Sequence, residues 1–266
     1  MLSSGRIHSL IDELANLLLL GIVSGGIAGA ISGFGSRVAM RIVGMMAEGV
    51  ERFRITDSGN RVGDITFGGT LTLVIFSMFL GIGGGLLYLA IRPYLPKRWH
   101  WSGLTFSILL LAIAGNLVIE GDNRDFRQFG ATAVNVLLFT TLFPLFGLLL
   151  AYLVTRIEPL ERLNISNTYL QIGMAGGLSL LFFIVMVMAI ITLIDPGADS
   201  GMTRQNMVII IGILGITGGG ILMNVLARSK SLSANKSWLR SGFLTIVGGI
   251  ALAGTYFNID ALIQIF

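Results

Sequence analysis

The chain has 266 residues, of which 54% are hydrophobic and only 12% are charged, and its mean hydropathy is +0.84. A soluble domain carries about 25% charged residues, so this chain cannot cover itself with a polar surface. Its formal charge of +4 comes from basic residues in short loops beside apolar segments, a pattern that sets membrane orientation and does not indicate nucleic-acid binding. Cysteine is absent, which excludes disulfides, thiolate metal sites and cysteine nucleophiles. These features predict an all-α polytopic membrane protein.

Seven apolar segments are predicted to cross the membrane as helices. The first begins near Leu14, behind a capping-box pattern at Ser9–Asp12, and ends near Phe34. The others cover residues 67–91, 101–119, 130–155, 168–194, 205–227 and 238–257, while the tail 259–266 is too short to span. Residues 53–67 show a strand, turn and strand pattern, which predicts a small extramembrane β-hairpin.

Two stretches of the sequence resemble each other. Aligning Lys97–Gly115 on Lys236–Gly254 needs no gap and gives seven identities in nineteen positions. Each stretch also follows a run of three glycines, at 83–85 and at 218–220. The match predicts an internal duplication within a single transmembrane domain: repeat 1 at 10–119, a linker helix at 130–156 and repeat 2 at 168–257. The linker would make the two three-helix repeats parallel, an arrangement similar in topology to that of the SWEET-type sugar transporters.

Glycines recur every four residues on several of the predicted helices. Gly21, Gly25, Gly29 and Gly33 form the longest row, and shorter rows are Gly81/Gly85, Gly173/Gly177 and Gly215/Gly219. Small residues at this spacing let two helix backbones approach closely and gain dispersion contacts that lipid cannot match. We expect these rows to be helix-packing surfaces.

Basic and tryptophan residues gather where the predicted helices end. The side that holds the N-terminus has the larger excess of Lys and Arg, which favours a cytoplasmic N-terminus in the cell's inner (plasma) membrane. Residues on this side that we expect to contact anionic headgroups are Arg92, Lys97, Arg98, Trp99, Trp101, Arg228, Lys236 and Trp238. On the opposite side, Arg37 and Arg41 extend the first glycine row. They are interpreted either as interfacial anchors or as ligands of a lipid phosphate or a partner's carboxylate.

The sequence offers no catalytic constellation. No charged residue lies near a predicted helix centre, no nucleophile–base pair or zinc motif is present, and the two histidines, His8 and His100, are placed at an interface. We therefore expect neither enzymatic activity nor a cofactor. Two functions stay open: an accessory or structural subunit that packs against lipids and other membrane proteins in a larger bacterial membrane complex, or a carrier or channel for a neutral or lipid-like solute.

Overall fold

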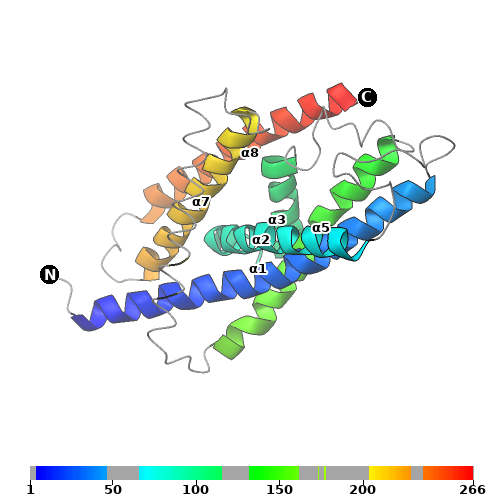
Figure 1. Ribbon diagram of the computed structural model, residues 1–266. Coiled ribbons are helices and arrows are strands. Elements are labelled where there is room, and N and C mark those ends of the chain that lie inside the picture. Colours follow the sequence, from blue (N-terminus) through cyan, green and yellow to red (C-terminus); the bar gives the residue numbers. More distant parts are fainter. Residues whose placement is uncertain are drawn as a thin grey trace.

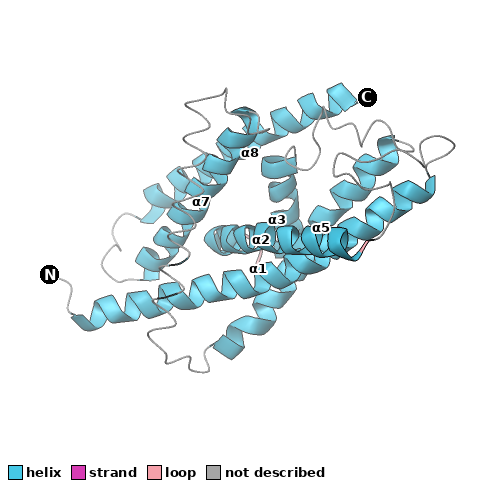
Figure 2. Cartoon of the chain, in the orientation of Figure 1, coloured by secondary structure: helices cyan, strands magenta, loops and turns pink. Residues whose placement is uncertain are grey.

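The computed structural model describes residues 4–46, 66–115, 132–161, 204–228 and 236–265, together with Gly173 and Gly177. These residues form helices and contain no strand (Figures 1 and 2). The hairpin predicted for residues 53–67 and the span predicted for residues 168–194 fall almost entirely outside them.

Six α-helices and one short 3-10 helix make up the described chain. They are α1 (Ser4–Met46), α2 (Phe67–Ile91), the 3-10 helix η2 (Arg92–Tyr94), α3 (Trp99–Ala114), α5 (Thr132–Glu161), α7 (Arg204–Arg228) and α8 (Lys236–Ile265). Four contain segments long and apolar enough to cross a membrane, namely 12–46, 67–94, 132–159 and 240–265, whereas the apolar parts of α3 and α7 are shorter. The described chain therefore has the architecture of a helical membrane protein.

The first helix is longer at both ends than the sequence analysis predicts. Helix α1 begins at Ser4, so the capping-box assignment at Ser9–Asp12 is wrong, and it continues past Phe34 to Met46. Its 43 residues span about 65 Å, twice the hydrocarbon thickness of about 30 Å. Tertiary packing supports the extension: a β-carbon added at Gly35 would lie 3.2 Å from Leu145 of α5, an approach closer than ordinary contact.

The C-terminal tail is also helical, although the sequence pattern predicts that the last helix ends at Phe257. Helix α8 continues without interruption to Ile265. The side-chain amide of Asn258 donates hydrogen bonds to the carbonyls of Leu111 (2.8 Å) and Ala112 (3.2 Å) at the end of α3. Because this amide is bonded to another helix, it does not compete for its own backbone, and the asparagine does not break α8.

Contacts between neighbouring helices define two ends of the bundle. One end, which we call the Arg92 end, gathers the starts of α1, α3 and α8 with the ends of α2, α5 and α7. The other, the Arg37 end, gathers the opposite termini. In Figure 1 the start of α1 lies at the far left of the view and its end at the far right, with the start of α5 beside that end.

The apolar core lies where α2, α3 and α5 meet. Tyr88 and Phe106 are fully buried and pack edge to face with their ring centroids 5.1 Å apart, and Phe106 also contacts Phe146 of α5. Buried Ile216 and Phe243 extend the same cluster to α7 and α8. This core joins α2, α3, α5, α7 and α8.

Candidate functional site

Helices α1 and α2 meet along the first glycine row. The row of α1 (Gly21, Gly25, Gly29, Gly33) lies against Ser77, Gly81 and Gly85 of α2. A β-carbon added at Gly29 would lie 2.9 Å from the Cα of Gly81, and one added at Gly85 would lie 2.9 Å from the Cα of Gly25. Real side chains do not approach backbone this closely, so only glycine fits at these positions. We call this contact the glycine seam.

The glycine row of α7 has a different environment. Within the described chain, and apart from the adjoining residues and backbone of α7 itself, no atom comes within 4 Å of a β-carbon added at Gly215 or Gly219. Val208 and Leu222 lie on the same face of the helix and are 52% and 59% exposed. We call this surface the α7 face; it consists of Val208, Gly215, Gly219 and Leu222. It is apolar, has no side chains at its two central glycines, and is not covered by any described residue.

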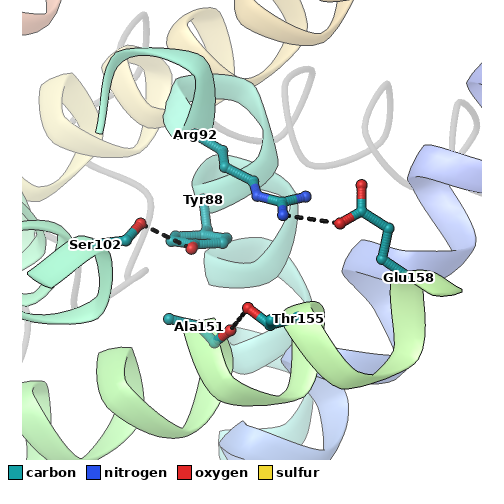
Figure 3. Close-up of polar contacts among 6 residues, drawn as sticks. All are labelled: Tyr88, Arg92, Ser102, Ala151, Thr155 and Glu158. Atoms are coloured by element: carbon teal, nitrogen blue, oxygen red, sulfur yellow. Dashed lines mark hydrogen bonds and ion pairs between the residues drawn. The ribbon is translucent and has the colours of Figure 1, made fainter. Parts of the chain in front are cut away.

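The polar contacts of the Arg92 end tie α2 to α3 and α5. The Tyr88 hydroxyl is 2.8 Å from the Ser102 hydroxyl, inside the bundle. One turn further along the chain, Arg92 donates to Glu158 of α5 at 2.8 Å (Figure 3). Arg92 and Glu158 are each about one-third exposed, at 32% and 35%, so water screens this ion pair and it contributes modestly to stability. Its main effect is to neutralise Arg92.

Two other arginines at this end lie over aromatic rings. The guanidinium carbon of Arg240 is 5.3 Å from the centroid of Tyr94, whose ring stacks on Phe243. The guanidinium carbon of Arg156 is 5.4 Å from the centroid of Tyr152, which packs edge to face against Trp99. Each is a cation–π contact at the polar end of apolar helices.

The predicted headgroup contacts fall at this same end. Two of the predicted basic residues, Lys97 and Arg98, lie in the loop between η2 and α3. Trp99 and Trp101 lie in the first turn of α3, and all four side chains are exposed. Arg228 ends α7, Lys236 begins α8 and Trp238 lies in its first turn, but their side chains lie outside the description. At the opposite end, Arg37 lies beside Gly69 in the first turn of α2, and Arg41, one turn beyond it, is exposed.

An asparagine on α7 completes the end of α2. The Asn224 amide donates to the carbonyls of Leu89 (3.0 Å) and Ala90 (3.1 Å). In a continuing helix the carbonyl of Leu89 would accept from residue 93, which is a proline and has no N–H. Asn224 supplies the missing donor, so the proline could have indicated that α2 needs a polar partner from another helix.

Several residues of the Arg92 end are not predicted as site residues from the sequence: Tyr88, Tyr94, Ser102, Tyr152, Arg156 and Glu158. Each is an ordinary interfacial or mid-helix residue in the sequence. Packing of α3, α5 and α8 brings Ser102, Glu158 and Arg240 beside residues of α2 and η2, whereas Arg156 and Tyr152 lie one turn apart on α5. Among the described residues, no three His, Cys, Asp or Glu side chains come close enough together to hold a metal ion.

Comparison of this chain with known protein families, with curated proteins and with solved structures finds no match.

Proposed function

We propose that this chain is a non-catalytic integral membrane protein that packs as an accessory subunit against other membrane proteins. The observation that carries the proposal is the contrast between its two main glycine rows. The seam of α1 and α2 is occupied within the chain, whereas the equivalent surface at Gly215 and Gly219 has no described neighbour. A small-residue row between exposed Val208 and Leu222 is the kind of surface on which a transmembrane helix of a partner packs.

The hydrogen bonds of the buried hydroxyl and amide groups support a packing role over a transport role. Ser24, Ser107 and Thr217 each donate to a carbonyl one turn earlier in their own helix. Ser102 is bonded to Tyr88, and Asn224 and Asn258 are bonded to helix ends. A solute path needs polar groups that can exchange partners with the solute, and the donors of these hydroxyl and amide groups already have acceptors within the chain.

We further propose seven spans with a cytoplasmic N-terminus, which puts the Arg92 end in the cytoplasmic leaflet. What supports the count is the position of two helix termini. Helix α5 ends at the Arg92 end, because Glu158 in its last turn pairs with Arg92. Helix α7 also ends there, because Asn224 near its C-terminus bonds to the end of α2. Helix α7 therefore starts at the Arg37 end. A chain that joins these two termini would have to cross the bundle once more, and residues 168–194 are apolar enough in sequence to form that proposed span.

The parallel duplication stays part of the proposal. Helices α2 and α7 both end at the Arg92 end, and α3 and α8 both start there, so the proposed counterparts run in the same direction. Gly115 and Gly254, which the alignment matches, both lie where α3 meets α8: Gly115 is beside Asn258, and Gly254 is beside Ile113. This pairing of counterparts favours a second candidate function, a carrier for a neutral or lipid-like solute built between the repeats.

The test of the subunit proposal replaces the two glycines of the α7 face. Gly215→Leu with Gly219→Leu is introduced into the full chain, which is then purified from its own membranes in a mild detergent. We expect the unchanged chain to comigrate with stoichiometric partner proteins, and the double variant to migrate alone while keeping its unfolding temperature. If the unchanged chain migrates alone, or if the double variant keeps the same partners, the subunit proposal is wrong.

The carrier is tested with the purified chain in proteoliposomes. Solute uptake by the chain alone, abolished by Arg37→Ala with Arg41→Ala, would favour the carrier over the subunit. The subunit proposal expects no uptake in either sample, and it expects the same double substitution to weaken association with a partner or a bound lipid.

A further inference from the structure

The Arg92 end carries positive charge that the described chain does not neutralise. Arg92 is paired with Glu158, but neither Arg156 nor Arg240 forms an ion pair with any residue in the described ranges. Both are exposed, and each is held over a tyrosine ring. Lys97 and Arg98, also exposed, add two further cations in the loop before α3.

Exposed aromatic side chains lie at the same end of the bundle as these cations, where the apolar helices end. Trp99 and Trp101 are 41% and 55% exposed, although the core beneath them is closed by Phe106 and Phe146. Exposed tryptophans at the polar end of apolar helices are typical of the headgroup layer, where one part of the indole contacts acyl chains and the N–H meets water. The cations and the aromatic rings therefore face the same boundary.

We propose that the Arg92 end binds anionic phospholipid headgroups, with the guanidinium groups of Arg156 and Arg240 as the phosphate ligands. Neither guanidinium forms an ion pair with a described residue, so its N–H groups can form two parallel hydrogen bonds to a phosphate. The tyrosine ring beneath each guanidinium fixes the cation in place, so little side-chain freedom is lost on binding. The inference rests on the membrane placement proposed above.

The surroundings of the arginines favour a lipid over a soluble anion. A free phosphate would use only the guanidinium groups, whereas a phospholipid also covers Trp99, Trp101 and Tyr152 with its glycerol backbone and upper acyl chains. Burial of that aromatic surface adds an apolar contribution that inorganic phosphate does not obtain.

The test uses the full chain in vesicles of phosphatidylcholine and phosphatidylglycerol in equal amounts, with only one of the two lipids brominated. Trp101→Phe and Trp238→Phe leave Trp99 as the only tryptophan, and Trp99 lies beside Tyr152, whose ring carries Arg156. We expect brominated phosphatidylglycerol to quench Trp99 more strongly than brominated phosphatidylcholine does. Arg156→Gln should lower the relative affinity for phosphatidylglycerol about fivefold, and the second substitution Arg240→Gln should lower it further.

Matched variants and competitors separate the outcomes. Thr255→Val, towards the Arg37 end of α8, should leave the preference unchanged because its exposed hydroxyl donates to Ala251 of its own helix. Arg156→Lys should retain only part of the preference because a lysine cannot form the paired bonds. Full competition by inorganic phosphate would show a simple anion site and overturn the lipid assignment. Equal quenching by both lipids, or a preference that survives Arg156→Gln with Arg240→Gln, would also overturn it.

The membrane placement is checked on the same sample. Flotation of the vesicles with the chain inserted shows that the placement holds, so a missing lipid preference then counts against this inference alone. A chain that fails to insert counts against the proposed function instead.

Discussion

Gly25 of α1 and Gly81 of α2 lie backbone to backbone, so that a β-carbon on either residue would collide with the carbonyl oxygen of the other. The neighbouring Gly26 lies on a different face, where an added β-carbon would be 3.6 Å from Ile82 and from Met78. Two adjacent glycines of one helix thus differ only in what they face.

This pair gives the first prediction. Gly25→Ala should lower the free energy of unfolding by about 1–3 kcal/mol, because the seam must open to admit the methyl group. Gly26→Ala should be neutral or stabilising by up to about 1 kcal/mol, because alanine favours the helix and has room there. Unfolding of both variants in the same detergent measures the difference. Equal stability of the two variants would show that α1 and α2 are not in close contact.

The second prediction concerns the asparagine that completes α2. Asn224→Leu removes both hydrogen bonds to the last turn and leaves the carbonyl of Leu89 without a donor. We expect a loss of about 1 kcal/mol, since interhelical hydrogen bonds in membranes average about 0.6 kcal/mol each. Thr245→Val is the control, because that exposed hydroxyl donates only to Ser241 of its own helix. A destabilisation by Thr245→Val as large as that by Asn224→Leu would argue against a special role for the asparagine.

A double-mutant cycle tests the ion pair between η2 and α5. Arg92→Gln, Glu158→Gln and the double variant should give a coupling energy of about 0.5–1 kcal/mol, small because water reaches both side chains. The coupling should decrease as salt is added. A coupling indistinguishable from zero at low salt would mean that the two side chains do not meet in the membrane-embedded protein.

Orientation can be measured because the chain contains no cysteine. Lys97→Cys places an exposed thiol at the Arg92 end, and Met46→Cys places one at the Arg37 end. In intact cells, an impermeant thiol reagent should label residue 46 and spare residue 97, as the positive-inside rule requires for a cytoplasmic Arg92 end. The reverse labelling would invert the proposed topology.

Local pattern was enough to predict the helices of the described chain and their apolar character. Spacing along one helix also predicted the glycine row on α1, because the four-residue period places all of its members on one face. The boundaries were less predictable: residues 35–46 and 259–265 continue as helix because Gly35 and Asn258 contact α5 and α3.

The partners at the Arg92 end could not be predicted from the same patterns. Arg92 and Glu158 are 66 positions apart, and the sequence places both near one interface without showing which cation meets which acid. The same holds for Arg240 and Tyr94, which meet only because α8 starts beside η2. Two local signals were present: Pro93 leaves a carbonyl without a donor, and the four-residue spacing of Tyr152 and Arg156 places them on one face of α5.

The most direct test of the subunit proposal is a photo-crosslinker at Leu222, which lies at one end of the α7 face, next to Gly219, and is 59% exposed. Irradiation of intact membranes should convert the chain into one discrete product of higher mass that contains a second protein. The Gly215→Leu, Gly219→Leu background should abolish that product. A chain whose mass stays unchanged after irradiation, or that gains only lipid, would contradict the proposal that this face docks another membrane protein.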